Sequence, residues 1–100
     1  MTPEAQLKKT CKLIAKNHGC MLYPASFRGR KGFPDSLLLC PAQALIYVEF
    51  KAFGGRLSEH QVSTILDLRM AGAEVWVVYR ETVFGDDLRR VLNERPIRFS

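Results

Sequence analysis

The clearest pattern along the chain is a run of apolar residues that ends in two charges. From Ala44 to Phe50 the sequence reads Ala-Leu-Ile-Tyr-Val-Glu-Phe, and Lys51 follows. Apolar residues at consecutive positions make both faces of a strand hydrophobic, which predicts a central strand of a sheet over 44–51. Side chains alternate along a strand, so Glu49 and Lys51 are expected on one face, roughly 6 to 7 Å apart. An unpaired buried charge is costly, so we expect partners for both.

Helical periodicity near the N-terminus predicts a first helix that ends at Gly19. Thr2 suits the N-cap, Pro3 suits the first turn, and Glu4 faces the positive end of the helix dipole. The predicted buried stripe consists of residues at helical spacing: Leu7, Cys11, Ile14 and His18. Lysines line an adjacent face, which is either solvated or a contact surface for a polyanion: Lys8, Lys12 and Lys16.

Two more strands are predicted before the central one. The run 21–25 is β-prone but contains Pro24, which cannot donate to a ladder, so an interrupted or edge strand is expected. Ser36 to Cys40 predicts a buried strand. Its connection to the central strand is so short that the two must pair antiparallel.

Beyond Lys51 the pattern predicts a helix, a strand and a helix. Ser58 and Gln61 have the spacing of a capping box, and Gly72 ends the helix that they begin. The apolar face of that helix is predicted to comprise Val62, Ile65, Leu66 and Met70. The β-prone run 74–79 is reached through a helix and is therefore expected to lie parallel to the central strand. Residues 86–93 predict a last amphipathic helix, with Leu88, Val91 and Leu92 inward.

This order, αβββαβα, predicts an α/β fold with a mixed β-sheet flanked by helices in two or three layers. The length predicts one domain over residues 1–100. No apolar run is long enough to span a membrane, and Glu4 and Lys8 stand where a secretion signal would be apolar, so an intracellular protein is expected. The three cysteines show no C-x-x-C spacing and are predicted to be buried thiols rather than a disulfide framework or zinc site.

The charge of +5 is concentrated in the first half of the chain. Residues 1–50 hold seven Lys and Arg against three acids, Glu4, Asp35 and Glu49. A basic surface of this kind can meet nucleic acid. The loop 27–34 combines Arg28, Arg30 and Lys31 with glycines, so we expect it to be flexible and to contact phosphates.

The antiparallel pair predicts a site, because it brings the start of one strand beside the end of the other. Asp35 and Glu49 are therefore expected side by side. Two neighbouring carboxylates repel each other unless a cation lies between them, and their oxygens suit Mg²⁺ or Mn²⁺. Lys51 on the same face could stabilise charge on a phosphate, so the set is equipped for metal-assisted phosphodiester hydrolysis. Taken singly, Glu49 and Lys51 could be a simple salt bridge and Asp35 a turn residue.

The motifs Phe33-Pro34-Asp35 and Glu49-Phe50-Lys51 resemble the PD-(D/E)XK nuclease superfamily. Together with Lys31 to Asp35, Gly55 to Gln61 and Gly72 to Val78, they resemble a stand-alone VRR-NUC domain over nearly the whole chain. The resemblance implies a restriction-endonuclease-like core. It also implies a metal held by Asp35, Glu49 and the backbone carbonyl of Phe50, with Lys51 catalytic and Glu4 and Gln61 completing the site.

The resemblance further implies an endonuclease that cuts branched DNA, such as four-way junctions or flaps, and that acts as a homodimer in the cytoplasm of a bacterium or of a phage-infected host. The residues expected to contact DNA are basic: Arg28, Arg30, Lys31, Lys8, Lys12 and Arg56. Two other functions remain open from the residues alone. One is a basic DNA-binding module without activity, and the other is a protein-interaction domain that uses the edge strand near Pro24.

Several candidate residues also have a purely structural interpretation. Glu4 could serve only the helix dipole, and Gln61 could serve only the capping box. His60 is expected to be an exposed helix residue, and His18 a core or capping residue. Trp76 and Tyr79 are expected to be core and interface aromatics.

Overall fold

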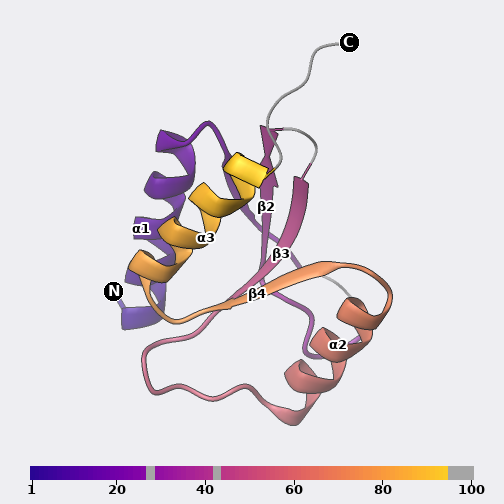
Figure 1. The fold of residues 1–100 in the computed structure, drawn as a ribbon. Coiled ribbons are helices and arrows are strands. Elements are labelled where there is room, and N and C mark those ends of the chain that lie inside the picture. Colours follow the sequence, from indigo (N-terminus) through magenta and orange to yellow (C-terminus); the bar gives the residue numbers. More distant parts are fainter. Residues whose placement is uncertain (27–28, 42–43, 95–100) are drawn as a thin grey trace.

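The chain folds around a mixed sheet of four strands in the order β1-β2-β3-β4, as Figure 1 shows. The structure is a computed structural model and describes residues 1–26, 29–41 and 44–94. In chain order the elements are α1 (Pro3–Asn17), β1 (Met21–Pro24), β2 (Ser36–Cys40), β3 (Ala44–Phe50), α2 (Glu59–Met70), β4 (Glu74–Val78) and α3 (Glu81–Glu94). The predicted order αβββαβα and the α/β fold with a mixed sheet flanked by helices are confirmed.

Strand β3 is a central strand of the sheet, as its apolar pattern predicted. It pairs antiparallel with β2, so that Ser36 lies opposite Val48, and parallel with β4, so that Glu49 lies opposite Val77. The ladder continues one residue beyond β3, because the backbone N–H of Lys51 donates to the carbonyl oxygen of Val78 at 3.0 Å. This pairing holds the charged end of β3 in a defined place.

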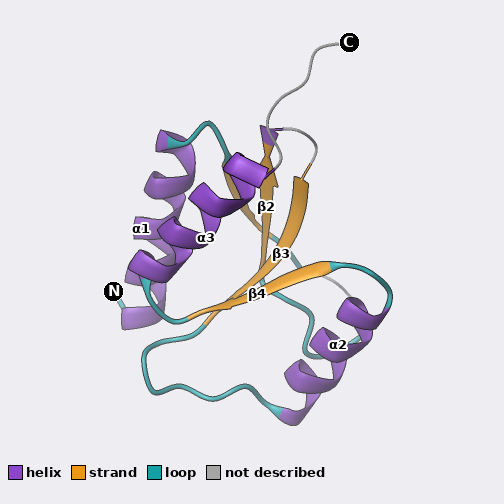
Figure 2. Cartoon of the chain, viewed as in Figure 1, coloured by secondary structure: helices purple, strands orange, loops and turns teal. Residues whose placement is uncertain are grey.

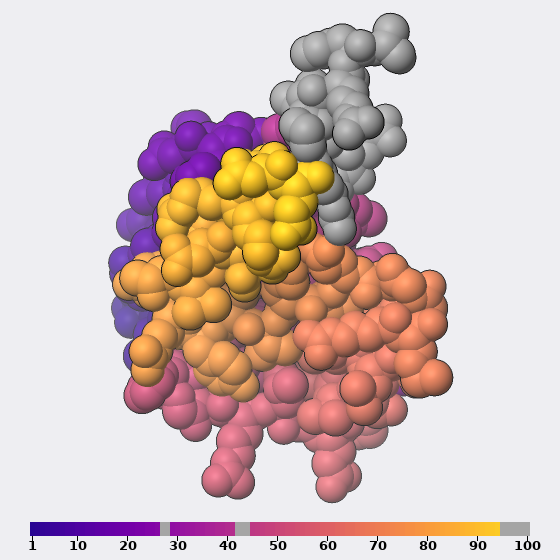
Figure 3. Space-filling view, viewed as in Figure 1, coloured from indigo at the N-terminus to yellow at the C-terminus, as the bar shows by residue number. Residues whose placement is uncertain are grey.

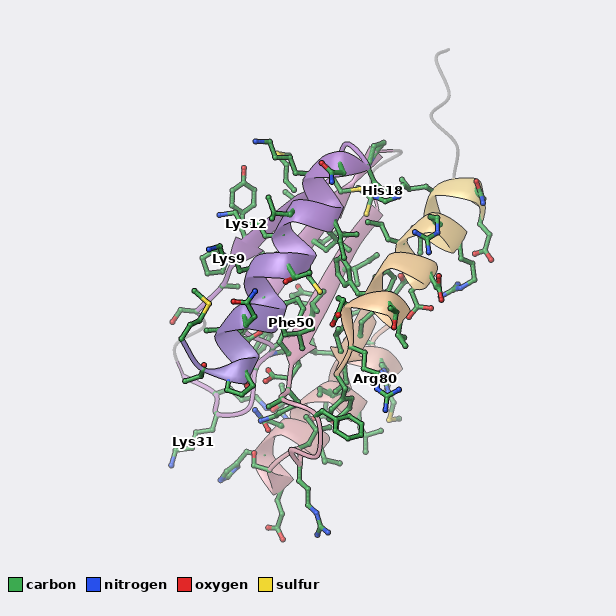
Figure 4. All side chains as sticks on the ribbon, turned by 90° about the vertical axis from the view of Figure 1, so that its left-hand side faces the viewer. Lys9, Lys12, His18, Lys31, Phe50 and Arg80 are labelled. Carbon is green, nitrogen blue, oxygen red and sulfur yellow. The ribbon has the colours of Figure 1, made fainter. Side chains whose placement is uncertain are left out.

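Helices α1 and α3 cover one face of the sheet, which Figure 2 shows on its left-hand side. The β3 side chains on that face, Ile46, Val48 and Phe50, are fully buried. Phe50 lies between α1 and α3 in Figure 4, and Phe84 of α3 packs edge-on against Trp76 of β4 with ring centroids 6.0 Å apart. These contacts make the main hydrophobic core of the domain.

The cysteines also belong to this core, since Cys11, Cys20 and Cys40 are buried thiols that are not joined in a disulfide. Burial raises the pKa of the Cys11 thiol to about 12, with a smaller contribution from the charge of Glu81. The prediction of buried thiols is therefore confirmed. Among the described residues, no helix combines the length and apolar character needed to cross a membrane.

The other face of the sheet is only partly covered. Helix α2 lies on that side, next to β4, and its Ile65 is buried. Further along the same face, Met21, Tyr23 and Leu45 expose about half of their surface, at 51%, 48% and 45%. The domain thus has one complete helical layer and a second that consists of α2 alone.

The prediction for α2 needs a correction. Val62, Leu66 and Met70 were expected on an apolar face together with Ile65, yet they are 42%, 53% and 87% exposed. The helix attaches to the domain through its N-terminal turn and through the buried side chains of Thr64 and Ile65. Periodicity identified an apolar stripe but could not show whether the same chain covers it.

The prediction for the last helix also needs a correction, because α3 begins at Glu81 rather than at residue 86. Thr82, Val83 and Gly85 are weak helix formers, so the local sequence does not indicate a helix there. The burial of Phe84 against Trp76 and Phe50 explains why these residues are helical. Tertiary packing overrides the local preference at this point.

The loop before β2 is tied to α2 by three contacts. Thr64 Oγ1 donates to the carbonyl oxygen of Lys31 at 2.9 Å, and Arg30 pairs with Asp67 at 2.7 Å. Gly32 packs directly on the α2 backbone: a Cβ there would lie 2.3 Å from the carbonyl carbon of His60. The loop and α2 can approach this closely only because residue 32 has no side chain.

We expect Gly32→Ala to lower the free energy of unfolding more than Gly29→Ala does. Both glycines have positive φ, at 84° and 92°. Alanine in that conformation costs each of them about 1–2 kcal/mol. Only Gly32 adds a backbone clash, since a Cβ at Gly29 meets nothing within 4 Å. Urea denaturation of the two variants measures the difference, and equal losses would contradict the contact between loop and helix.

Candidate functional site

The candidate site lies where β2 begins and β3 ends. Because Ser36 is paired with Val48, the next pair outward in this antiparallel ladder is Asp35 with Glu49. The Asp35 side chain is partly exposed, at 29%, whereas that of Glu49 is nearly closed off from solvent, at 5%. The structure therefore brings the two predicted metal ligands together.

Two polar side chains contact the buried Glu49 carboxylate. Gln61 Nε2 donates to Glu49 Oε2 at 3.3 Å, and Lys51 Nζ lies 3.9 Å from the same oxygen. The Lys51 side chain is itself mostly buried, at 18% exposure. The salt bridge between Glu49 and Lys51 is thus real, and it lies inside the candidate site rather than on an open strand end.

Gln61 has both of the roles that the sequence left as alternatives. Its Oε1 accepts from the backbone N–H of Ser58 at 2.8 Å, while its own backbone N–H donates to Ser58 Oγ at 3.1 Å, which completes the capping box. Its Nε2 remains available and donates to Glu49. The cap therefore fixes the side chain that reaches into the site.

Helix α1 supplies an acid and a lysine to the same place. Lys8 Nζ lies 2.8 Å from Asp35 Oδ2 and 3.6 Å from Glu4 Oε2. Glu4 also lies in the first turn of α1, where it complements the helix dipole, so its structural and site positions coincide. Lys8, by contrast, was expected in a row with Lys12 and Lys16 along the helix. Its spacing of four residues from Glu4 was the signal that could have placed it here.

Burial and the charges of the site together shift two pKa values. Burial raises the pKa of Glu49 to about 7, the charges of Asp35 and Glu4 add to the rise, and Lys51 and Lys8 oppose it. Partial burial lowers the pKa of Lys8, but the hydrogen bond to Asp35 and the charges of Asp35, Glu4 and Glu49 outweigh it, so that this pKa is raised. The site thus has an excess of negative charge that stabilises cations.

The residues present fit a divalent ion with hard-oxygen ligands. Asp35 and Glu49 could hold it, together with the backbone carbonyl of Phe50, whose buried ring anchors that segment. Within residues 1–26, 29–41 and 44–94, no group of three or more Asp, Glu, His or Cys side chains is arranged to enclose a metal. Mg²⁺ commonly binds through one or two carboxylates and keeps several waters, so a site with two carboxylates is compatible with it.

The predicted DNA-contacting residues occupy different positions around this site. Arg28 lies outside the described residues. Arg30 and Lys31 line a hollow of about 610 Å³ that reaches Asp35, although Arg30 also pairs with Asp67. Lys12 is exposed on α1, and Lys31 is exposed in the loop before β2, as Figure 4 shows. Arg56 is exposed in the loop between β3 and α2, a loop that forms part of the lower edge of the molecule in Figure 3.

The two histidines lie in the positions that the sequence predicted for structural residues. His60 is exposed on α2. His18 is the C-cap of α1, and its Nδ1 lies 2.8 Å from the carbonyl oxygen of Ile14. Gly32 and Thr64, which position α2 beside the site, were not identified from the sequence. A small or hydroxyl residue alone does not indicate a close backbone contact.

The buried Glu49 predicts a pH-dependent stability. Between its ordinary pKa of 4.5 and the raised value of about 7, the folded state binds more protons than the unfolded state. With a chelator present, the contribution of Glu49 to the free energy of unfolding should therefore fall as pH rises through this window, by on the order of 2 to 3 kcal/mol.

Urea denaturation of the wild type and of Glu49→Gln, at about pH 5 and about pH 8, measures this contribution. The variant should be relatively more stable at the higher pH because it carries no buried charge. The exposed Glu59 provides the matched control as Glu59→Gln. A difference between the wild type and Glu49→Gln that does not change with pH would contradict the expectation.

Comparison with known proteins adds to this geometry. The sequence model of the VRR-NUC domain family matches residues 2–81, which include all five candidate catalytic residues. A solved structure described as a VRR_NUC domain is similar with a TM-score of 0.76 and 27% sequence identity, and the match covers 96% of this chain and 99% of that chain. No curated protein matches the chain. With most of its length matched, including the strand pair that carries Asp35 and Glu49, the chain belongs to the VRR-NUC family of nuclease domains.

Proposed function

We propose that this chain is a divalent-metal-dependent DNA endonuclease that hydrolyses phosphodiester bonds. The observation that carries the proposal is the convergence of Asp35 and Glu49 at the end of the β2–β3 pair, with Lys51 Nζ 3.9 Å from Glu49 Oε2. Membership of a nuclease family supports the reaction class. Mg²⁺ or Mn²⁺ is the proposed cofactor, because the ligands are carboxylate and carbonyl oxygens.

Each side chain of the site has a proposed role in the reaction. When bound, the ion would act as a Lewis acid on water and on a phosphodiester oxygen. Asp35 and Glu49 would hold it, and Gln61 orients the Glu49 carboxylate through its hydrogen bond. Lys51, held nearby and mostly buried, would stabilise the negative charge that develops on the phosphate. Glu4, at the start of α1, adds negative charge to the site and lies 3.6 Å from Lys8 Nζ.

The proposed substrate is branched DNA that is recognised by its shape. Arg30 and Lys31 line the hollow beside Asp35 and would contact phosphates, which position a duplex without reading its sequence. Lys12 and Arg56, both exposed, would extend the contact along the DNA backbone. A DNA-binding module without activity is the competing function, and it differs in showing salt-dependent binding with no cleavage.

We also propose that the domain pairs as a homodimer through its uncovered apolar surfaces. These are the sheet-face residues Met21, Tyr23 and Leu45, and the α2 stripe Val62, Leu66 and Met70. Both groups lie on the side of the sheet that α1 and α3 do not cover. In a two-fold interface the same patch of each subunit meets its copy in the partner, so exposed apolar side chains of this kind suit self-association. Two active sites would also suit the cutting of two strands.

We expect Asp35→Asn and Lys51→Met each to lower the rate of branched-DNA cleavage roughly 100-fold or more. The first variant weakens the metal site, and the second removes the cation beside it. Gel-based cleavage assays with Mg²⁺ or Mn²⁺ measure the rate, and binding at low salt shows that the DNA is still held. Asp86→Asn on α3, an exposed acid, is the control and should cleave as the wild type does. Full activity in Asp35→Asn would refute the assignment of Asp35 as a metal ligand.

We expect the wild type to be a dimer at micromolar concentration and Leu66→Glu to be a monomer. The substitution places like charges close together across a two-fold interface. Leu45→Glu tests the sheet face in the same way, and Val83→Glu on α3, where Val83 is 50% exposed, is the control that should remain dimeric. Multi-angle light scattering gives the mass of each. A monomeric wild type would refute the homodimer.

A further inference from the structure

We propose that Lys8 is a built-in competitor of the metal ion: its ammonium group binds the carboxylate of Asp35, a proposed metal ligand, and must move away when the ion binds. This inference rests on the proposed metal site and goes beyond it. It assigns to Lys8 a control of metal affinity that is separate from any contact with DNA.

The contacts of Asp35 make Lys8 the group that the ion displaces. One carboxylate oxygen, Oδ1, accepts from Ser36 Oγ at 3.2 Å, and the other, Oδ2, lies 2.8 Å from Lys8 Nζ. Each oxygen keeps a second lone pair, so a metal could coordinate Asp35 beside these contacts. A dication on this carboxylate would, however, repel the Lys8 ammonium group only a few ångströms away, whereas the neutral Ser36 hydroxyl is not repelled in this way. Ser36 is buried at 5% exposure, whereas the Lys8 side chain is 38% exposed on a flexible stem. Lys8 can move into solvent, and Ser36 has little room to move.

The charges of the site lead to the same conclusion. When all groups are ionised, the site has three carboxylates and two ammonium groups. Glu4 and Asp35 contact Lys8, and Glu49 contacts Lys51. A divalent ion held by Asp35 and Glu49 would supply more positive charge than Lys8 does. Once the ion is present, the attraction that holds Lys8 on Asp35 weakens, because an ammonium group and a metal ion repel each other at short range.

Glu4 gives the displaced lysine a second position. It lies one helical turn before Lys8 on α1, and its Oε2 is already 3.6 Å from Lys8 Nζ. A small rotation of the lysine stem can transfer the ammonium group from Asp35 to Glu4 without unfolding any of α1. Lys8 therefore has two alternative partners, Asp35 and Glu4.

An ordinary structural salt bridge predicts a different result from a competitor. Removal of a structural bridge lowers stability and leaves metal affinity unchanged or weaker. Removal of a competitor lowers stability in chelator, because three carboxylates lose a counter-charge, and at the same time tightens metal binding. The opposite signs of the two effects distinguish the roles.

The test measures Mn²⁺ affinity by isothermal titration calorimetry without DNA, and thermal unfolding in the presence of EDTA. Lys8→Gln should bind Mn²⁺ roughly 10-fold more tightly than the wild type, because a charged hydrogen bond no longer has to be broken. It should also have a lower Tm in EDTA. Lys9→Gln is the matched control, since Lys9 is the exposed neighbour on α1 and its loss changes the net charge equally. This control should change Mn²⁺ affinity less than twofold, on the scale of an exposed charge.

The outcomes separate this inference from the proposed function. If the wild type binds Mn²⁺ and Lys8→Gln binds it equally or more weakly, the competitor role is overturned while the metal site stands. If the wild type binds no Mn²⁺, the metal site is overturned and the competitor role with it. Lys8→Arg keeps the charge and is the second variant, should Lys8→Gln fail to fold. It should bind Mn²⁺ no more tightly than the wild type, and tighter binding would count against the inference.

Discussion

The burial of a carboxylate at the end of a central strand is the constraint on which the rest of the site depends. Glu49 is held where β3 is paired on both sides, and its carboxylate is nearly closed off from water. Such a group is costly unless it is neutralised or bonded. Gln61 and Lys51 supply the hydrogen bond and the counter-charge that this residue requires, whereas the neighbouring Asp35 adds to the negative charge that a cation would offset.

Local geometry explains why part of this site was predictable. Asp35 directly precedes β2 and Glu49 lies near the end of β3, and the connection between these strands is very short, so the meeting of the two residues followed from pairing rules alone. Gln61 was harder, because the capping box accounts for the residue without any site. Only the structure shows that the side-chain amide of Gln61 bonds to both residues at once: its oxygen accepts from Ser58, and its nitrogen donates to Glu49.

The failures of prediction have a common physical cause, which is that the deciding partner is distant in the sequence. The start of α3 depends on Phe84 reaching Trp76, and the exposure of Leu66 depends on where α2 is attached. Lys8 looked like one member of a basic row, although its position one turn after Glu4 directs it toward Asp35. Hydrophobic periodicity shows which residues share one face of a helix, but tertiary contacts decide what that face packs against.

The close contact at Gly32 has a consequence for how the site could be altered. Because the loop backbone lies directly on the first turn of α2, the basic segment and the helix that carries Gln61 form one mechanical unit. A strand of nucleic acid that pulls on the loop would displace the glutamine with it. To replace this loop with that of another nuclease, one would therefore have to transfer the loop and α2 together.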